Sequence, residues 1–142
     1  GNQYKNLRRT IINYDALLKA AAQQSEPQRL LFVFAQPELP EGHGKDEAER
    51  FHAGQGGALN PIMYVDKTLE ELSTFSALVS ESQQMKQQWQ IVFVAALAGK
   101  NGALPSSEEA QATLDMMAKS VQMGAVSNFL AYDRDGNSVQ FL

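Results

Sequence analysis

Hydrophobic residues near the start of the chain recur with helical spacing. Five apolar positions follow one another at alternating intervals of four and three, the period of a helix with one buried stripe: Leu7, Ile11, Tyr14, Leu18 and Ala21. Pro27 biases the residue before it away from the helical region, so the helix should end before this proline. The pattern predicts an amphipathic first helix.

Two continuous apolar runs follow a different pattern, with no alternation between polar and apolar positions. They cover residues 30–35 and 90–98, and the second is rich in β-branched and aromatic side chains. Such runs are typical of strands that are covered on both faces of a sheet. We therefore expect Ile91, Phe93 and Val94 to lie in a central, buried strand. A shorter strand is predicted over residues 62–65.

Two more helices are indicated by capping boxes, in which a hydroxyl and a carboxylate three residues apart satisfy free backbone amides. Thr68 and Glu71 begin one, and Ser106 and Glu109 begin the other, which Gly124 is placed to end. The predicted buried stripes are Leu69, Leu72, Phe75 and Val79 in the first, and Ala110, Leu114, Met117 and Val121 in the second.

The order of these elements suggests a fold class. Residues 129–132 and 138–142 flank an Asp-Gly turn and predict a terminal β-hairpin. Strands separated by helices imply right-handed crossovers. We expect a single α/β domain over residues 1–142, a three-layer sandwich with a mixed, mostly parallel sheet of about four or five strands and helices on both faces.

Composition narrows the possible chemistry. The chain has 142 residues, of which 44% are hydrophobic and 20% charged, values typical of an ordinary globular domain. It contains no cysteine, which excludes disulfides, thiolate zinc sites and a cysteine nucleophile. No apolar run approaches the roughly 20 residues of a membrane helix, and no signal-peptide apolar region is present at the start. We expect a soluble, cytoplasmic protein.

The charge balance bears on partners. A formal charge of −4 argues against general affinity for nucleic acid or an anionic membrane surface. The expected partner is an unidentified protein or a small-molecule ligand. A homodimer is also expected, since small α/β domains often pair open sheet edges, and the predicted strand 138–142 is the candidate edge.

Reactive side chains are concentrated in one segment, a long charged and glycine-rich loop over residues 36–60. The span from Glu38 to His52 has five acidic and two basic residues, so it carries −3 of the total charge of −4. A connection of this length without strong structure of its own is functional, partly disordered, or contains a short helix, here around residues 46–51. The first hypothesis is a non-catalytic binding or interaction module with this loop as its contact surface.

The alternative is a small metal-dependent enzyme with its site in the same loop. Imidazole and carboxylate ligands suit Zn²⁺, Mn²⁺ or Fe²⁺, and this interpretation makes His43, Glu49 and His52 the metal ligands. Glu47 or Asp46 would then act as general base on a bound water. The two histidines are nine residues apart, which matches no short zinc-ligand motif. No cofactor besides this divalent ion is expected.

Overall fold

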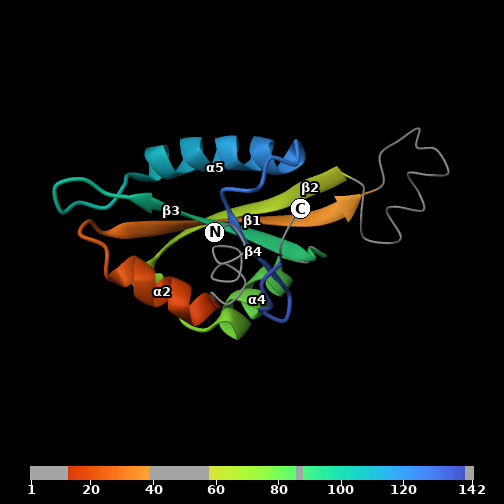
Figure 1. Ribbon diagram of the computed structural model, residues 1–142, viewed down its shortest axis with the longest axis horizontal. Coiled ribbons are helices and arrows are strands. Elements are labelled where there is room, and N and C mark those ends of the chain that lie inside the picture. The colour runs from red at the N-terminus through yellow and green to blue at the C-terminus, as the bar shows by residue number, and fades with distance from the viewer. Residues whose placement is uncertain (1–12, 39–57, 86–87, 140–142) are drawn as a thin grey trace, which may run out of the picture.

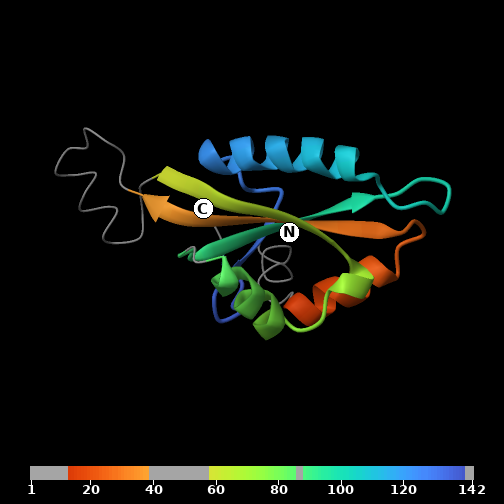
Figure 2. The same cartoon turned by 180° about the vertical axis from the view of Figure 1, so that it is seen from behind.

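The computed structural model describes residues 13–38, 58–85 and 88–139, which form one sheet with helices on both faces (Figures 1 and 2). No helix in these ranges is long and apolar enough to cross a membrane. The elements in chain order are α2 (Tyr14–Ala22), β1 (Gln28–Glu38), β2 (Ala58–Thr68), the 3₁₀ helix η1 (Leu69–Glu71), α4 (Phe75–Gln84), β3 (Ile91–Ala98), α5 (Ser107–Gln122) and β4 (Leu130–Asp133).

The sheet has the strand order β2-β1-β3-β4, and every neighbouring pair is antiparallel. The prediction of a mostly parallel sheet was therefore wrong. It assumed that strands joined by a helix lie side by side and run the same way. β2 and β3, which α4 connects, do run in the same direction, but β1 lies between them. β3 and β4, which α5 connects, are neighbours but run in opposite directions.

The two central strands divide the core into two layers because successive side chains of a strand point to opposite faces. Leu30, Phe32 and Phe34 of β1 pack with buried residues of α2 and α4. The alternate residues of the same strand, Leu31, Val33 and Ala35, pack with buried residues of α5. In β3, Phe93 and Val94 are buried as predicted, and Ile91 is partly exposed. Helices therefore cover both faces of an antiparallel sheet.

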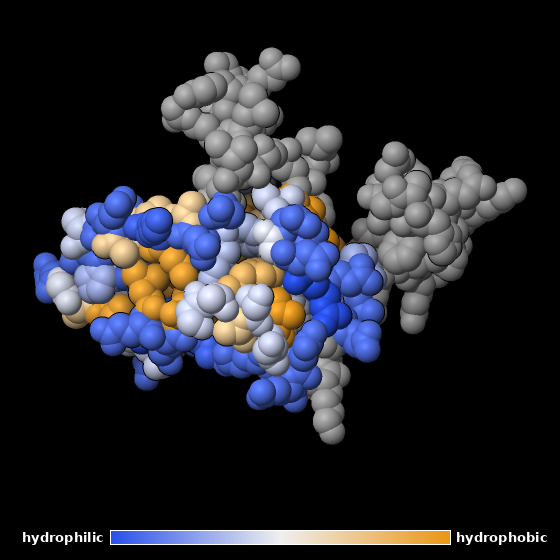
Figure 3. Space-filling model, turned by 90° about the horizontal axis from the view of Figure 1, so that it is seen from below, coloured by the Kyte–Doolittle hydropathy of each residue, from blue (hydrophilic) through white to orange (hydrophobic). Residues whose placement is uncertain are grey.

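The described elements leave part of the face that carries α2 and α4 uncovered. Viewed from this side, apolar residues form patches between polar ones (Figure 3). The core cluster of this face extends to partly buried side chains on the two helices and on η1, among them Leu17, Leu18, Leu69, Leu72 and Val79. The core of this face therefore reaches the surface between its helices.

The helix predicted from Thr68 is divided in two. Thr68 ends β2, η1 makes a single turn, and residues 72–74 are non-helical before α4 begins at Phe75. Thr74 caps α4, its Oγ1 accepting a hydrogen bond of 3.1 Å from the backbone N–H of Ala77. The expected short strand at 62–65 is longer, and the expected loop at 36–60 is shorter, because residues 36–38 and 58–60 pair with one another as strand.

The third predicted helix agrees with the structure, and the first agrees only at its C-terminal end. The first helix was expected from Leu7, but Asn13 is extended and α2 begins at Tyr14, while Leu7 and Ile11 lie outside the described residues. α2 ends at Ala22, before Pro27, and its N-cap Asn13 accepts a hydrogen bond of 2.8 Å from the N–H of Ala16. α5 begins after Ser106 and buries the predicted stripe. Gly124 follows it with a φ of 78°, a left-handed conformation that glycine adopts at little cost.

The turn of the predicted C-terminal hairpin is present in the structure. Asp133 accepts hydrogen bonds of 2.9 Å from the backbone N–H groups of Asp135 and Asn137. A single β-bridge joins Tyr132 to Ser138. The rest of the predicted second strand, residues 140–142, lies outside the described residues. Part of the outer edge of β4 is thus already paired.

Candidate functional site

The predicted site residues lie outside the described ranges. His43, Asp46, Glu47, Glu49 and His52 all belong to residues 39–57. Their arrangement as metal ligands or as a general base remains a prediction from the sequence. Within the described ranges, no group of three or more His, Asp or Glu side chains is placed to hold a metal ion.

The structure does describe how both ends of this loop are held. We call the paired residues 36–38 and 58–60 the loop anchor, with Gln36 opposite Asn60 and Glu38 opposite Ala58. Paired strands lie about 4.8 Å apart, so the loop leaves and re-enters the sheet at neighbouring positions. Ala35, next to the anchor, is buried and its carbonyl accepts a hydrogen bond of 3.0 Å from the N–H of Gln90. The anchor is therefore continuous with the buried centre of the sheet.

An aromatic and cationic contact lies at the same end of the sheet. Trp89 lies two residues before β3, is fully buried, and donates a hydrogen bond of 2.7 Å from its indole N–H to Oγ of Ser82. The guanidinium of the exposed Arg134 lies 5.6 Å from the centre of the Trp89 ring, a cation–π distance. Arg134 follows β4, whose last residue Asp133 is opposite Ile91. A positive charge is therefore held at the end of the sheet where the acidic loop is anchored.

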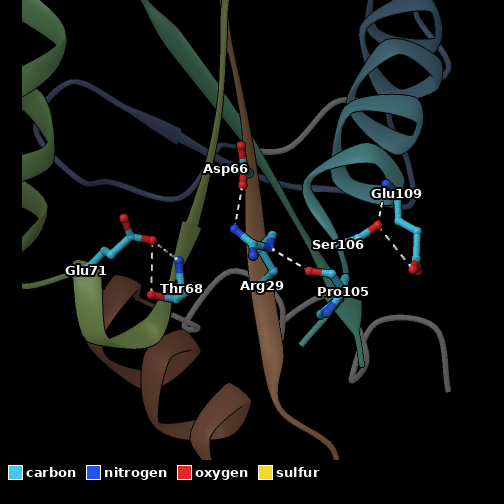
Figure 4. Close-up of polar contacts among 7 residues, drawn as sticks. All are labelled: Arg29, Asp66, Thr68, Glu71, Pro105, Ser106 and Glu109. Carbon is cyan, nitrogen blue, oxygen red and sulfur yellow. Dashed lines mark hydrogen bonds and ion pairs between the residues drawn. The ribbon is translucent and has the colours of Figure 1, made fainter. Parts of the chain in front are cut away.

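A cluster of polar contacts lies at the opposite end of β1, around Arg29 (Figure 4). A guanidinium nitrogen of Arg29 is 2.7 Å from Oδ2 of Asp66, and its Nε donates a 3.3 Å hydrogen bond to the carbonyl of Pro105. The two charged side chains are only 16% and 33% exposed. Arg29 thus links β1 to Asp66 of β2 and to Pro105, which lies two residues before α5.

The nearby carboxylates are engaged in local structure. Glu71 accepts hydrogen bonds of 2.8 and 3.0 Å from the N–H and hydroxyl of Thr68. These bonds, the backbone one first, lower the pKa of the Glu71 carboxyl. Ser106 and Glu109 form the second capping contact, in which Oγ of Ser106 accepts a 3.1 Å hydrogen bond from the Glu109 N–H. Both predicted capping pairs therefore form contacts. The Glu71 carboxylate accepts from the Thr68 backbone, whereas the Glu109 carboxylate accepts a 3.3 Å hydrogen bond from the Ser106 hydroxyl.

A third carboxylate closes the turn between β3 and α5. The two oxygens of Glu26 accept hydrogen bonds of 2.7 and 2.8 Å from the N–H groups of Asn101 and Gly102. Both turn residues have positive φ, which directs their successive N–H groups toward one anion. The contacts of Glu26 and Arg29 were not predicted, because each joins residues far apart in the sequence. Together these contacts, which we call the clamp, join the residues at the start of β1 to β2 and to the segment between β3 and α5.

The clamp leads to a stability prediction. Arg29→Met should lower the free energy of unfolding by roughly 1–3 kcal/mol, because it leaves the half-buried Asp66 without its ion-pair partner. Lys67→Met is the matched control: it breaks an ion pair of similar length with Glu81, whose side chain is 56% exposed, and should cost about 0–1 kcal/mol. Urea denaturation measures both. An Arg29→Met loss no larger than that of the control would contradict the clamp.

Comparison with known proteins yielded no match: no protein-family model, curated protein or solved structure is similar to this chain at a significant level.

Proposed function

We propose that this protein is a non-catalytic binding module that uses the segment of residues 36–60, the loop anchor together with residues 39–57 between its two strands, as its contact surface. The observation that carries the proposal is the loop anchor, in which residues 36–38 and 58–60 are paired strand. The anchor extends the two longest strands of the sheet, and β1 is buried up to Ala35. A long loop held at both ends by such a scaffold is the usual design of a recognition surface.

The charge of the loop indicates the kind of partner. The span from Glu38 to His52 carries a net charge of −3, from five acidic residues against Lys45 and Arg50. A surface with this excess of carboxylates attracts cationic groups, and the attraction is weakened by salt. The proposed partner therefore presents lysine or arginine side chains.

The proposal is tested by shortening the loop. Replacing residues 39–57 with Asn-Gly joins the paired Glu38 and Ala58 by a two-residue hairpin turn. The fold should persist, because each halving of a flexible loop changes its closure free energy by only about 0.6 kcal/mol. Binding of a lysine-rich peptide, measured by titration calorimetry at low salt, should be lost. Far-ultraviolet circular dichroism and the thermal midpoint report on the fold.

Two controls separate charge from length and from metal binding. The triple variant Asp46→Asn, Glu47→Gln, Glu49→Gln keeps the loop length and should also lose the peptide. Failure of the parent protein to bind the peptide, or binding that survives in either variant, would contradict the proposal. So would a rise in thermal midpoint on adding Zn²⁺ or Mn²⁺ that His52→Ala removes and Lys45→Ala retains, which would favour the metal-dependent enzyme.

A further inference from the structure

The outer side of α5 carries a regular row of exposed residues. Its members, which we call the α5 seam, are spaced three, four, three and four residues apart: Glu109, Ala112, Met116, Lys119 and Met123. They lie opposite the buried stripe that includes Leu114 and Val121. The side chains of Met116 and Met123 are 70% and 83% exposed, and no described element covers this side of α5 (Figures 1 and 2).

This spacing is that of a contact between two helices. Residues that repeat every three and four positions form a continuous row along one side of a helix and pack against a similar row on a partner helix. The polar face of a surface helix ordinarily carries charged residues, and exposed methionines are adaptable contact residues. The α5 seam is thus an apolar row with one charge near each end.

We propose that α5 packs against α5 of a second copy of this chain in antiparallel orientation, forming a homodimer. The charges of the seam are self-complementary in this orientation. When Ala112 faces Met116 of the second copy, Glu109 faces Lys119, because the two pairs share one midpoint on the helix. Each Met116 then meets the small Ala112 of the second copy, and each Glu109 carboxylate meets a Lys119 ammonium group.

The ends of the helix agree with this arrangement. Leu104, three residues before α5, is 44% exposed, and Met123 directly follows its last residue. Antiparallel packing brings each Met123 to the end of the partner helix where Leu104 lies. A parallel arrangement would instead place Glu109 against Glu109 and Lys119 against Lys119, which like charges oppose.

The open sheet edges are less suited to pairing with a second copy. β2 is a long edge strand, but it contains Pro61 and a register shift beside it, two features that oppose edge-to-edge pairing. The outer edge of β4 is bridged by Ser138 of the same chain. A single helix pair buries less than the about 800 Å² per partner of a standard interface, so the α5 dimer should dissociate on dilution.

Analytical ultracentrifugation over a concentration series tests the apolar part of the seam. The parent chain should approach twice the monomer mass as concentration rises. Met116→Gln and Met123→Gln should each weaken dimerisation about tenfold or more. Met85→Gln is the matched control, because Met85 is 61% exposed at the end of α4, and it should dimerise like the parent. A parent chain that stays monomeric up to about 1 mM would overturn the proposal.

A charge exchange tests the orientation. Lys119→Glu should prevent dimerisation, since it places two carboxylates against each other, and Glu109→Lys should do the same with two ammonium groups. The double variant restores opposite charges at each contact and should dimerise again. Lys119→Glu leaves the Ser106 cap intact, so its thermal midpoint reports on the fold independently. Dimerisation unaffected by Lys119→Glu, or a double variant that stays monomeric, would overturn the antiparallel α5 contact.

Discussion

Replacing Phe93 with alanine is expected to lower the free energy of unfolding by roughly 3–5 kcal/mol. Phe93 is 0% exposed in β3, between β1 and β4, and belongs to the core layer beneath α5. Its ring packs edge-on against Phe129 with 6.5 Å between the ring centres. Truncation removes this apolar area and leaves a cavity that two neighbouring strands and a helix cannot fill. Urea denaturation measures the change.

A residue on the same strand provides the control for this prediction. Leu97 lies four positions further along β3, so it points to the same face, but it is only partly buried. Leu97→Ala should therefore cost less than half as much as Phe93→Ala. A loss below about 1 kcal/mol for Phe93→Ala would mean that β3 is peripheral and that the core lies elsewhere.

Alkaline pH is expected to destabilise the protein through two buried tyrosines. Burial raises the pKa of Tyr14 and of Tyr132 from the ordinary 10 to about 12, with a smaller contribution from Asp15 at Tyr14 and from Tyr14 at Tyr132. The unfolded chain releases these protons near pH 10, whereas the folded protein keeps them to about pH 12. The stabilising contribution is complete below pH 10 and is lost as pH rises toward the folded value.

The size of this effect follows from the pKa shifts. Between pH 10 and 12, each tyrosine should reduce the free energy of unfolding by about 1.4 kcal/mol per pH unit, so both together contribute on the order of 5 kcal/mol. Urea denaturation at a series of pH values measures the loss. In the folded protein the tyrosinate absorbance of Tyr14 and Tyr132 should appear near pH 12, and the difference between the parent and Tyr14→Phe titrations isolates that of Tyr14.

Tyr14→Phe isolates one of the two groups. The buried hydroxyl of Tyr14 has no hydrogen-bond partner in the described part of the chain, so removing it should raise the stability at neutral pH by about 1 kcal/mol. The edge-on packing of this ring on Phe75, with 5.4 Å between ring centres, would be retained. The alkaline loss should fall by about half. Equal alkaline loss in the parent and in Tyr14→Phe would show that Tyr14 does not titrate in this range.

Part of the fold could be predicted because it depends on nearby residues. A helix joins residues three and four apart, so the buried stripe of α5, its Ser106 cap and Gly124 after its end are all visible in the sequence. The apolar run at 30–35 likewise predicted a strand with no solvent-facing side, and Leu30 to Ala35 are buried. The run at 90–98 correctly predicted β3, which is buried from Val92 to Val94 but exposes Ala96 and Ala98. These features need no knowledge of which strand lies beside which.

The candidate site could be predicted only as a composition. Histidines and carboxylates gathered in residues 36–60 suggested a contact surface or a metal site, but spacing alone did not define a ligand set. Tertiary structure added the loop anchor, because the pairing of Gln36 with Asn60 joins segments that are far apart in the chain. It also placed Arg134 at the same end of the sheet, through the pairing of β4 with β3.

Helical period, capping pairs and continuous apolar runs are local properties, so the sequence predicted α5, the C-terminal end of α2 and the position of the central strands, although not the start of α2 at Tyr14. The direction and neighbours of each strand depend on tertiary contacts and were visible only in the structure. A strand buried on both faces has the same apolar pattern in a parallel and in an antiparallel sheet. The ion pair between Arg29 and Asp66 could not be predicted for the same reason, because it is the antiparallel register of β1 and β2 that brings the two residues together.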